Sequence, residues 1–284
     1  FHPDAGIRDS VASRGLGDVY KRQPIIEHTE VGKMSGHSKW STIKHKKAIT
    51  DARRGKLFTK LSKEIIVAAK QGGGDLDMNF RLRMAVQIAK DNNMPADNID
   101  RAIKRGTGES SDGVVMAEMV YEGYGPGGIG IMVETLTDNK NRTVSDIRST
   151  LSKAGGNMAE SGAVAWQFEQ KGVIVVDADT SEAEDLALIA IDAGADDFET
   201  YDGTLHVYSE PNSLENIRST LTDSEAKVSS TELSMIPSNT VMLDSKKAIQ
   251  TLRLLDSLEE LDDVQKVYSN ADFPEEAMDD FKAG

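Results

Sequence analysis

The sequence predicts an α+β fold in which a small N-terminal helical domain is followed by two α/β-sandwich domains, one of them ferredoxin-like and inserted in the other. Three observations support this prediction. The 284 residues exceed one ordinary core and fit two or three compact domains. Helical periodicity dominates residues 56–105. Between residues 168 and 237, strand and helix patterns follow the order β-α-β-β-α-β, which is the order of a ferredoxin-like unit.

Charge is distributed unevenly along the chain, although the net charge of −14 argues against a nucleic-acid partner. Residues 1–33 hold 5 basic and 5 acidic side chains, and residues 34–108 hold 16 and 7, a net charge of +9. Residues 109–284 hold 12 basic and 35 acidic side chains, a net charge of −23. This asymmetry predicts a polyanion-binding module attached to an acidic body. The alternative is that the two oppositely charged parts simply pack against each other.

Residues 1–33 show no helical or strand periodicity. The stretch from Arg14 to Gln23 resembles translated sequencing-adapter material, and the segment lacks the apolar region of a signal peptide. We therefore expect residues 1–33 to be a non-native or disordered extension.

The first predicted helix, residues 56–70, is amphipathic. On a helical wheel, Leu57, Leu61 and Ile65 fall on one side and the lysines fall on the other, where only Val67 interrupts them. The helix is expected to dock by its apolar side and to present its lysines outward. These lysines are Lys56, Lys60, Lys63 and Lys70.

Further basic residues precede this helix, in a stretch whose only acidic residue is Asp51. Clustered cations displace counterions from a phosphate backbone, which is the main sequence-independent source of affinity for DNA or RNA. Trp40 lies among them and either stacks on an unpaired base or anchors a small core. The candidate nucleic-acid-binding residues are Lys39, Trp40, Lys44, His45, Lys46, Lys47, Arg53, Arg54, Lys56, Lys60, Lys63 and Lys70.

Two more helices are predicted, at residues 79–90 and 95–105, with Pro95 in the first turn of the second. Their short connection invites comparison with a helix-turn-helix motif, in which the start of the second helix contacts base edges. Here that start contains Asp97 and Asp100, which phosphate would repel. Shape-based or RNA binding is therefore favoured over sequence-specific contact with the major groove.

Several ordered motifs in this part resemble the YebC/PmpR family, and the resemblance extends from Met34 to about Tyr268. One departure is Phe80, where the family pattern suggests proline. The resemblance implies a three-domain arrangement and two functions: DNA-binding transcriptional regulation, or translation with the basic domain meeting ribosomal RNA, as in related mitochondrial translational activators. The motifs are Gly36-His37-Ser38-Lys39-Trp40, Lys44-His45-Lys46-Lys47, Arg54-Gly55-Lys56-Leu57-Phe58-Thr59-Lys60-Leu61, Gly72-Gly73-Gly74, Asn93-Met94-Pro95 and Arg101-Ala102-Ile103-Lys104-Arg105-Gly106.

In the acidic body, strands are expected at 114–121 and 129–135 around a glycine-rich segment, residues 123–128. Its glycines match the dinucleotide-binding spacing, but a strand follows instead of a helix, so we interpret the segment as a hairpin loop. A helix at 143–154 comes next. In the ferredoxin-like unit, Ser181 is the expected helix N-cap.

A turn at Asp202-Gly203 is expected to join two strands of that unit as a hairpin. A helix at 245–261 and a strand at 264–268 could complete the sheet begun at residue 114. The predicted domains are residues 34–108, residues 109–167 plus 239–284, and the inserted residues 168–238.

Catalytic chemistry is not indicated. The sequence contains no Cys, and its His residues lack the partners of a catalytic or zinc site. No apolar run is long enough to span a membrane, and the absence of Cys suits the reducing cytoplasm. We predict a non-enzymatic cytoplasmic regulator without metal, cofactor or small-molecule substrate, and expect a monomer. The favoured partner is ribosomal RNA or the ribosome; the alternatives are duplex DNA and an acidic protein bound by the lysines.

Overall fold

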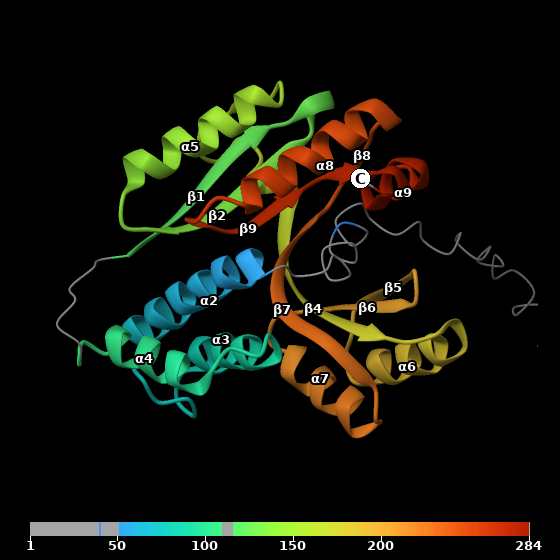
Figure 1. Ribbon diagram of the computed structural model, residues 1–284. Helices are drawn as coiled ribbons and strands as arrows, with labels where there is room; N and C mark the ends of the chain where they lie inside the picture. The colour runs from blue at the N-terminus through green and yellow to red at the C-terminus, as the bar shows by residue number, and fades with distance from the viewer. Residues whose placement is uncertain (1–39, 41–50, 110–115, 284) are drawn as a thin grey trace, which may run out of the picture. The chain divides into compact units, whose positions relative to one another are not determined.

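The computed structural model describes residue 40, residues 51–109 and residues 116–283 (Figure 1). Its first part is helical, as predicted. Ile65, Leu82 and Ile99 come one from each helix and are buried together in one core. The three helices are α2 (Asp51–Gly72), α3 (Phe80–Asp91) and α4 (Ala96–Gly106).

The connections between these helices are fixed by backbone hydrogen bonding. After α3, Asn93 adopts a left-handed conformation with φ 58°, and the Met94 N–H donates to the Ala89 carbonyl at 2.9 Å, which closes the end of the helix. At the end of α4, a Cβ on Gly106 would come within 2.5 Å of the Ile66 carbonyl oxygen. Glycine at this position therefore allows α4 to approach α2 closely.

Asn79 joins α2 to α3 through its buried side chain. Its Oδ1 accepts from the Leu82 N–H at 3.1 Å and so caps α3, while its Nδ2 donates to the Ala68 and Gly73 carbonyls at 2.8 Å each. We expect Asn79→Ala to lower the free energy of unfolding by about 2 kcal/mol, because it removes the cap of α3 and two side-chain hydrogen bonds to the end of α2. Urea denaturation of the full chain measures this; a change below about 0.5 kcal/mol would contradict it.

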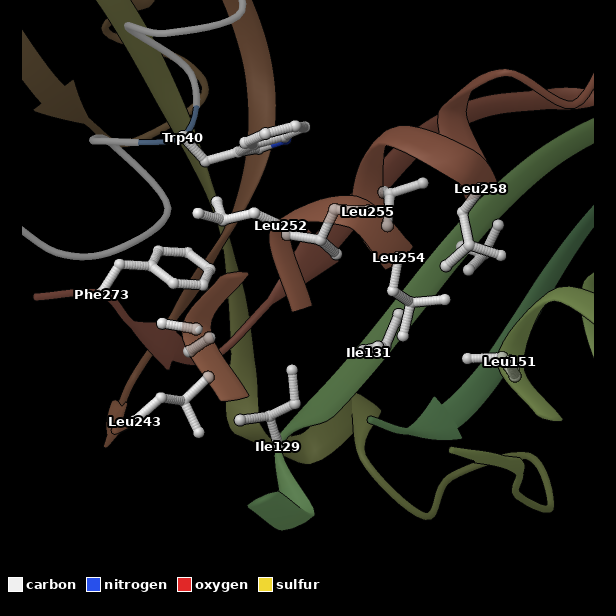
Figure 2. Close-up of a cluster of buried hydrophobic side chains, with 14 of the residues drawn as sticks. Trp40, Ile129, Ile131, Leu151, Leu243, Leu252, Leu254, Leu255, Leu258 and Phe273 are labelled. Atoms are coloured by element: carbon white, nitrogen blue, oxygen red, sulfur yellow. The ribbon is translucent and has the colours of Figure 1, made fainter. Parts of the chain in front are cut away.

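The next part is a four-stranded sheet with strand order β3-β1-β2-β9. Leu151 of α5 and Leu252 of α8 are buried with Ile131 of β2 in the core beneath these two helices (Figures 1 and 2). The prediction that the C-terminal strand completes the sheet begun by the first hairpin is confirmed, since β9 pairs with β2. The bounds are β1 (Ala117–Tyr124), β2 (Gly130–Thr137), β3 (Asn157–Met158), β9 (Val264–Ser269), α5 (Lys140–Lys153) and α8 (Ser245–Glu259).

Between β3 and α8 the chain forms a second antiparallel sheet with strand order β5-β6-β4-β7, the predicted β-α-β-β-α-β unit. Asp202 and Gly203 have φ values of 49° and 76° in the turn between β5 and β6, as the hairpin prediction requires. The prediction of Ser181 as the N-cap of α6 is wrong. The helix begins at Thr180, and its N-cap is Asp179, whose side chain accepts from the N–H groups of Ser181 and Glu182. The bounds are β4 (Phe168–Asp177), α6 (Thr180–Asp192), β5 (Asp197–Tyr201), β6 (Thr204–Ser209), α7 (Leu214–Asp223) and β7 (Lys227–Pro237).

Short elements connect and close these layers. The glycine-rich segment is a hairpin connection, as expected, but Gly123 and Tyr124 already belong to β1. No helix in the part of the chain that the structure describes is long and apolar enough to cross a membrane. The remaining elements are the 3-10 turns η1 (Pro126–Gly128) and η2 (Ala165–Gln167), the paired strands β8 (Val241–Met242) and β10 (Ala271–Asp272), and helix α9 (Glu275–Ala283).

Candidate nucleic-acid interface

The predicted nucleic-acid-binding residues fall into three groups in the structure. Lys39, Lys44, His45, Lys46 and Lys47 lie outside the described residues. Arg53, Arg54 and Lys70 belong to α2, and the last two have exposed side chains. Trp40 and the lysines 56, 60 and 63 contact the C-terminal part of the chain.

Trp40 is buried, which contradicts its prediction as a base-stacking residue. Its side chain is 5% exposed and packs in the core beneath α8 (Figure 2). The centre of its ring lies 5.7 Å from that of Phe281. The indole N–H donates to Glu259 at 3.3 Å. The alternative role, an anchor for a core, is the one observed. A large flat apolar ring gains more from this burial than from exposure to solvent.

Three of the lysines of α2, Lys56, Lys60 and Lys63, contact the end of α8, whereas the sequence predicts that the lysines face outward; only Lys56 and Lys70 are exposed. We call Lys56, Lys60 and Lys63 the lysine row, and residues 259–263 the α8 end. Lys56 Nζ contacts the carboxylate and the carbonyl of Glu260 at 2.9 and 3.1 Å. Lys60 Nζ donates to the Glu259 carbonyl. Ammonium groups are favoured here because the last turn of a helix exposes unpaired carbonyls and carries partial negative charge.

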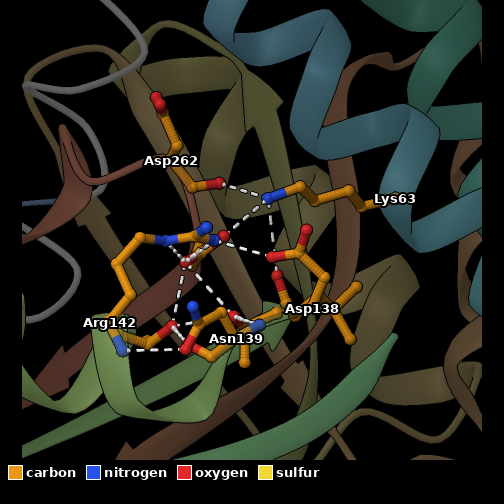
Figure 3. A network of polar contacts seen from close by, with 9 residues as sticks. Lys63, Asp138, Asn139, Arg142 and Asp262 are labelled. Carbon is orange, nitrogen blue, oxygen red and sulfur yellow. Dashed lines mark hydrogen bonds and ion pairs between the residues drawn. The ribbon is translucent and has the colours of Figure 1, made fainter. Parts of the chain in front are cut away.

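Lys63 reaches the most buried part of this contact, where Asp263 is the common acceptor. Its Nζ lies 2.9 Å from one carboxylate oxygen of Asp263 and 2.8 Å from the Asp262 carbonyl (Figure 3). Arg142 Nη2 lies 2.7 Å from the other carboxylate oxygen, which Thr143 and Thr137 also approach at 2.8 and 3.2 Å. The Asp263 side chain is 8% exposed, so these partners replace water around a buried charge.

The pKa of Asp263 follows from this setting. Burial acts to raise the pKa of the carboxyl, but hydrogen bonds from Arg142, Lys63 and Thr143 outweigh it and lower the pKa to about 2. Asp263 therefore stays ionised at physiological pH and links α2, α5 and the α8 end.

A cleft of about 880 Å³ adjoins this network. More carboxylates than cationic side chains line the cleft, so its net negative charge would repel a phosphate group. Among the residues that the structure describes, no three His, Asp or Glu side chains gather in a way that would hold a metal ion. The charged residues lining the cleft are Lys56, Lys63, Arg142, Asp138, Asp146, Glu260, Asp262 and Asp263.

Helices α3 and α4 are joined by a short turn, as expected, and the start of α4 carries exposed acidic side chains. Asp97 and Asp100 are exposed, whereas Lys104 and Arg105 lie exposed in the last turn. A helix that meets the major groove by its first turn would bring these carboxylates toward phosphate. The first turn of α4 therefore presents no basic side chain that could contact bases or phosphates in the major groove.

Comparison with known proteins covers most of the chain. A family model described as the TACO1/YebC protein N-terminal domain matches residues 38–109, and one described as the TACO1/YebC second and third domain matches residues 116–271. A "Probable transcriptional regulatory protein" of Dehalococcoides mccartyi is 54% identical over 248 residues, 87% of this chain and 98% of the relative. One of Halothermothrix orenii is 53% identical over 250 residues, 87% of this chain and 98% of the relative.

A solved structure agrees with these matches. The crystal structure of a conserved hypothetical protein from Aquifex aeolicus superposes with a TM-score of 0.76 at 44% identity, and covers 83% of this chain and 97% of that one. Sequence and fold agree over both the helical part and the two sheets. The chain belongs to the TACO1/YebC family.

Proposed function

We propose that this protein is a non-enzymatic regulator of gene expression that binds RNA, in the setting of the ribosome, through the basic segment that precedes and begins α2. The observation that carries the proposal is the net charge of +9 in residues 34–108 beside a body of net charge −23. The acidic body engages the lysine row, but six further cations lie ahead of it with Asp51 as the only acid among them. These are Lys39, Lys44, Lys46, Lys47, Arg53 and Arg54.

The division of charge along the chain supports the proposal. Two described residues that flank the basic segment contact the C-terminal part of the chain: Trp40 is buried against α8 and α9, and Lys56 is paired with Glu260. The body's 35 acidic residues repel phosphate, so the basic segment is the part of the chain whose charge suits a polyanion.

RNA is favoured over duplex DNA by the acidic start of α4, where Asp97 and Asp100 are exposed. RNA is recognised by shape and by phosphate and ribose contacts, which cations supply without base-reading side chains. The test is direct binding of the full chain to a labelled RNA hairpin and to a DNA duplex of equal length and sequence at 0.15 M salt. We expect the RNA to bind more tightly and to be displaced poorly by excess duplex.

A second candidate is DNA-binding transcriptional regulation; the relatives named "Probable transcriptional regulatory protein" favour the transcriptional role. Equal or tighter binding of the duplex in the same experiment would support it and would contradict the RNA proposal. Weak binding to both, with retained affinity for an acidic protein, would support the adaptor alternative.

A further inference from the structure

The outer edge of the second sheet exposes three large apolar side chains. Leu188 and Ile191 of α6 are 65% and 39% exposed, and Phe198 of the edge strand β5 is 40% exposed. Phe198 is paired with Val207 of β6, which is buried in the core beneath α6 and α7. Because directly opposite residues of two antiparallel strands share a face, Phe198 lies on the helix-covered face, at the open edge of the sheet.

The orientation of α6 brings its exposed apolar residues toward the same edge. Ala187 and Ala190 are buried against the sheet. Ile189 is partly buried against the same core, to which α7 contributes Leu214 and Ile217, so the flank of α6 that carries Ile189 faces α7. Ile191 is two residues from Ile189, about 200° around the helix, and therefore lies on the flank away from α7, toward β5.

The surroundings of these residues carry charge of one sign. Between Lys171 and Arg218 the sequence contains twelve acidic residues and no Lys or Arg. Glu184, Asp185 and Asp192 are exposed and lie three or four residues from Leu188, on the same side of α6. An apolar centre ringed by charged groups is the usual anatomy of a protein interface.

We propose that this surface, the α6–β5 rim of Leu188, Ile191 and Phe198 with Glu184, Asp185 and Asp192, docks a basic protein segment that carries apolar side chains among its Lys or Arg residues. The apolar side chains would fill the centre, and the cations would pair with the surrounding carboxylates. Nucleic acid does not fit, because its phosphates meet only like charge here. A second copy docking by the same surface would place its carboxylates against these. The inference is independent of RNA binding by the N-terminal segment.

The test uses the full chain and a labelled 16-residue helical peptide with leucine on one face and lysine on the other, measured by fluorescence anisotropy without nucleic acid. Leu188→Ser/Ile191→Ser/Phe198→Ser is expected to weaken binding by about ten-fold or more, as loss of central apolar anchors does. Glu184→Gln/Asp185→Asn/Asp192→Asn is expected to weaken it and to flatten its salt dependence. A matched control replaces three exposed apolar residues elsewhere, Val120→Ser/Trp166→Ser/Met242→Ser, and should leave affinity unchanged.

Several outcomes would overturn the proposal. One is equal binding of a peptide with serine in place of every leucine, since charge alone would then suffice. Another is an equal loss of affinity in the rim variant and in the matched control. Concentration-dependent self-association that the rim variant abolishes, with no loss of peptide binding, would assign the surface to a second copy. Circular dichroism of each variant confirms that the fold is retained, as expected for exposed positions.

Discussion

Replacing Asp263 with asparagine is expected to lower the free energy of unfolding by about 3 kcal/mol. The carboxylate is the shared acceptor for Lys63 and Arg142, and Lys63 is itself only 14% exposed. Without it, a largely buried ammonium group loses its counter-charge, which costs more than the loss of a surface ion pair. Chemical denaturation of the full chain at pH 7 measures the effect.

The neighbouring Asp262 provides a matched control, because its side chain is exposed and Lys63 uses only its carbonyl. Asp262→Asn should change stability by less than about 0.5 kcal/mol. The pH dependence gives a second check. A carboxyl whose pKa falls from 3.8 to about 2 on folding stabilises the fold fully above pH 4, and this stabilisation is lost as the pH falls toward 2.

The stability difference between the wild-type protein and Asp263→Asn should therefore shrink by about 2 kcal/mol over that interval. An equal loss in the two asparagine variants, or a difference that does not vary with pH, would show that Asp263 does not hold these elements together.

Replacing Lys44, Lys46 and Lys47 with alanine is expected to weaken RNA binding by about 50-fold at 0.15 M salt. Each phosphate contact to a single strand contributes about −0.7 to the slope of log K against log salt, or about 0.6 log unit of affinity at this salt. If about five phosphates are contacted, the slope should fall from about −3.5 to about −1.4. Titrations at several salt concentrations measure both quantities.

Two comparison variants sharpen this result. Lys140→Ala/Lys153→Ala/Lys246→Ala removes the same charge from exposed positions of the acidic body and should leave the salt slope unchanged. Lys60→Ala/Lys63→Ala should reduce stability, with less than about threefold loss of affinity, because both side chains are engaged by the α8 end. A loss as large as that of the triple variant would mean that the lysine row leaves the α8 end to bind RNA.

Much of the fold could be predicted from local pattern. The β-α-β-β-α-β order and the Asp202-Gly203 turn depend on neighbours in the sequence, and both match the structure. The N-cap of α6 was misplaced because Asp179 and Ser181 both favour that position, and the local sequence alone does not decide which side chain reaches the free N–H groups.

The side chains of the lysine row are oriented by partners about two hundred residues away in the sequence. Helical periodicity alone carries no information about such distant partners. Two signals pointed to it. Val67 interrupts the basic side of α2 and is only 4% exposed, so that side of the helix is partly covered by protein. The run Glu259-Glu260-Leu261-Asp262-Asp263 spans the end of the helix predicted at 245–261, and places carboxylates where the helix already exposes carbonyls. The packing of oppositely charged parts of the chain against each other therefore accounts for the lysine row.

Co-sedimentation of the full chain with ribosomes, in the presence of excess random duplex DNA, tests the central claim most directly. The account predicts that the wild-type protein and Lys140→Ala/Lys153→Ala/Lys246→Ala remain with the ribosomes, whereas Lys44→Ala/Lys46→Ala/Lys47→Ala stays in the supernatant. Release of the wild-type protein by the competing DNA, or sedimentation of all three proteins alike, would contradict RNA binding through the basic segment ahead of α2.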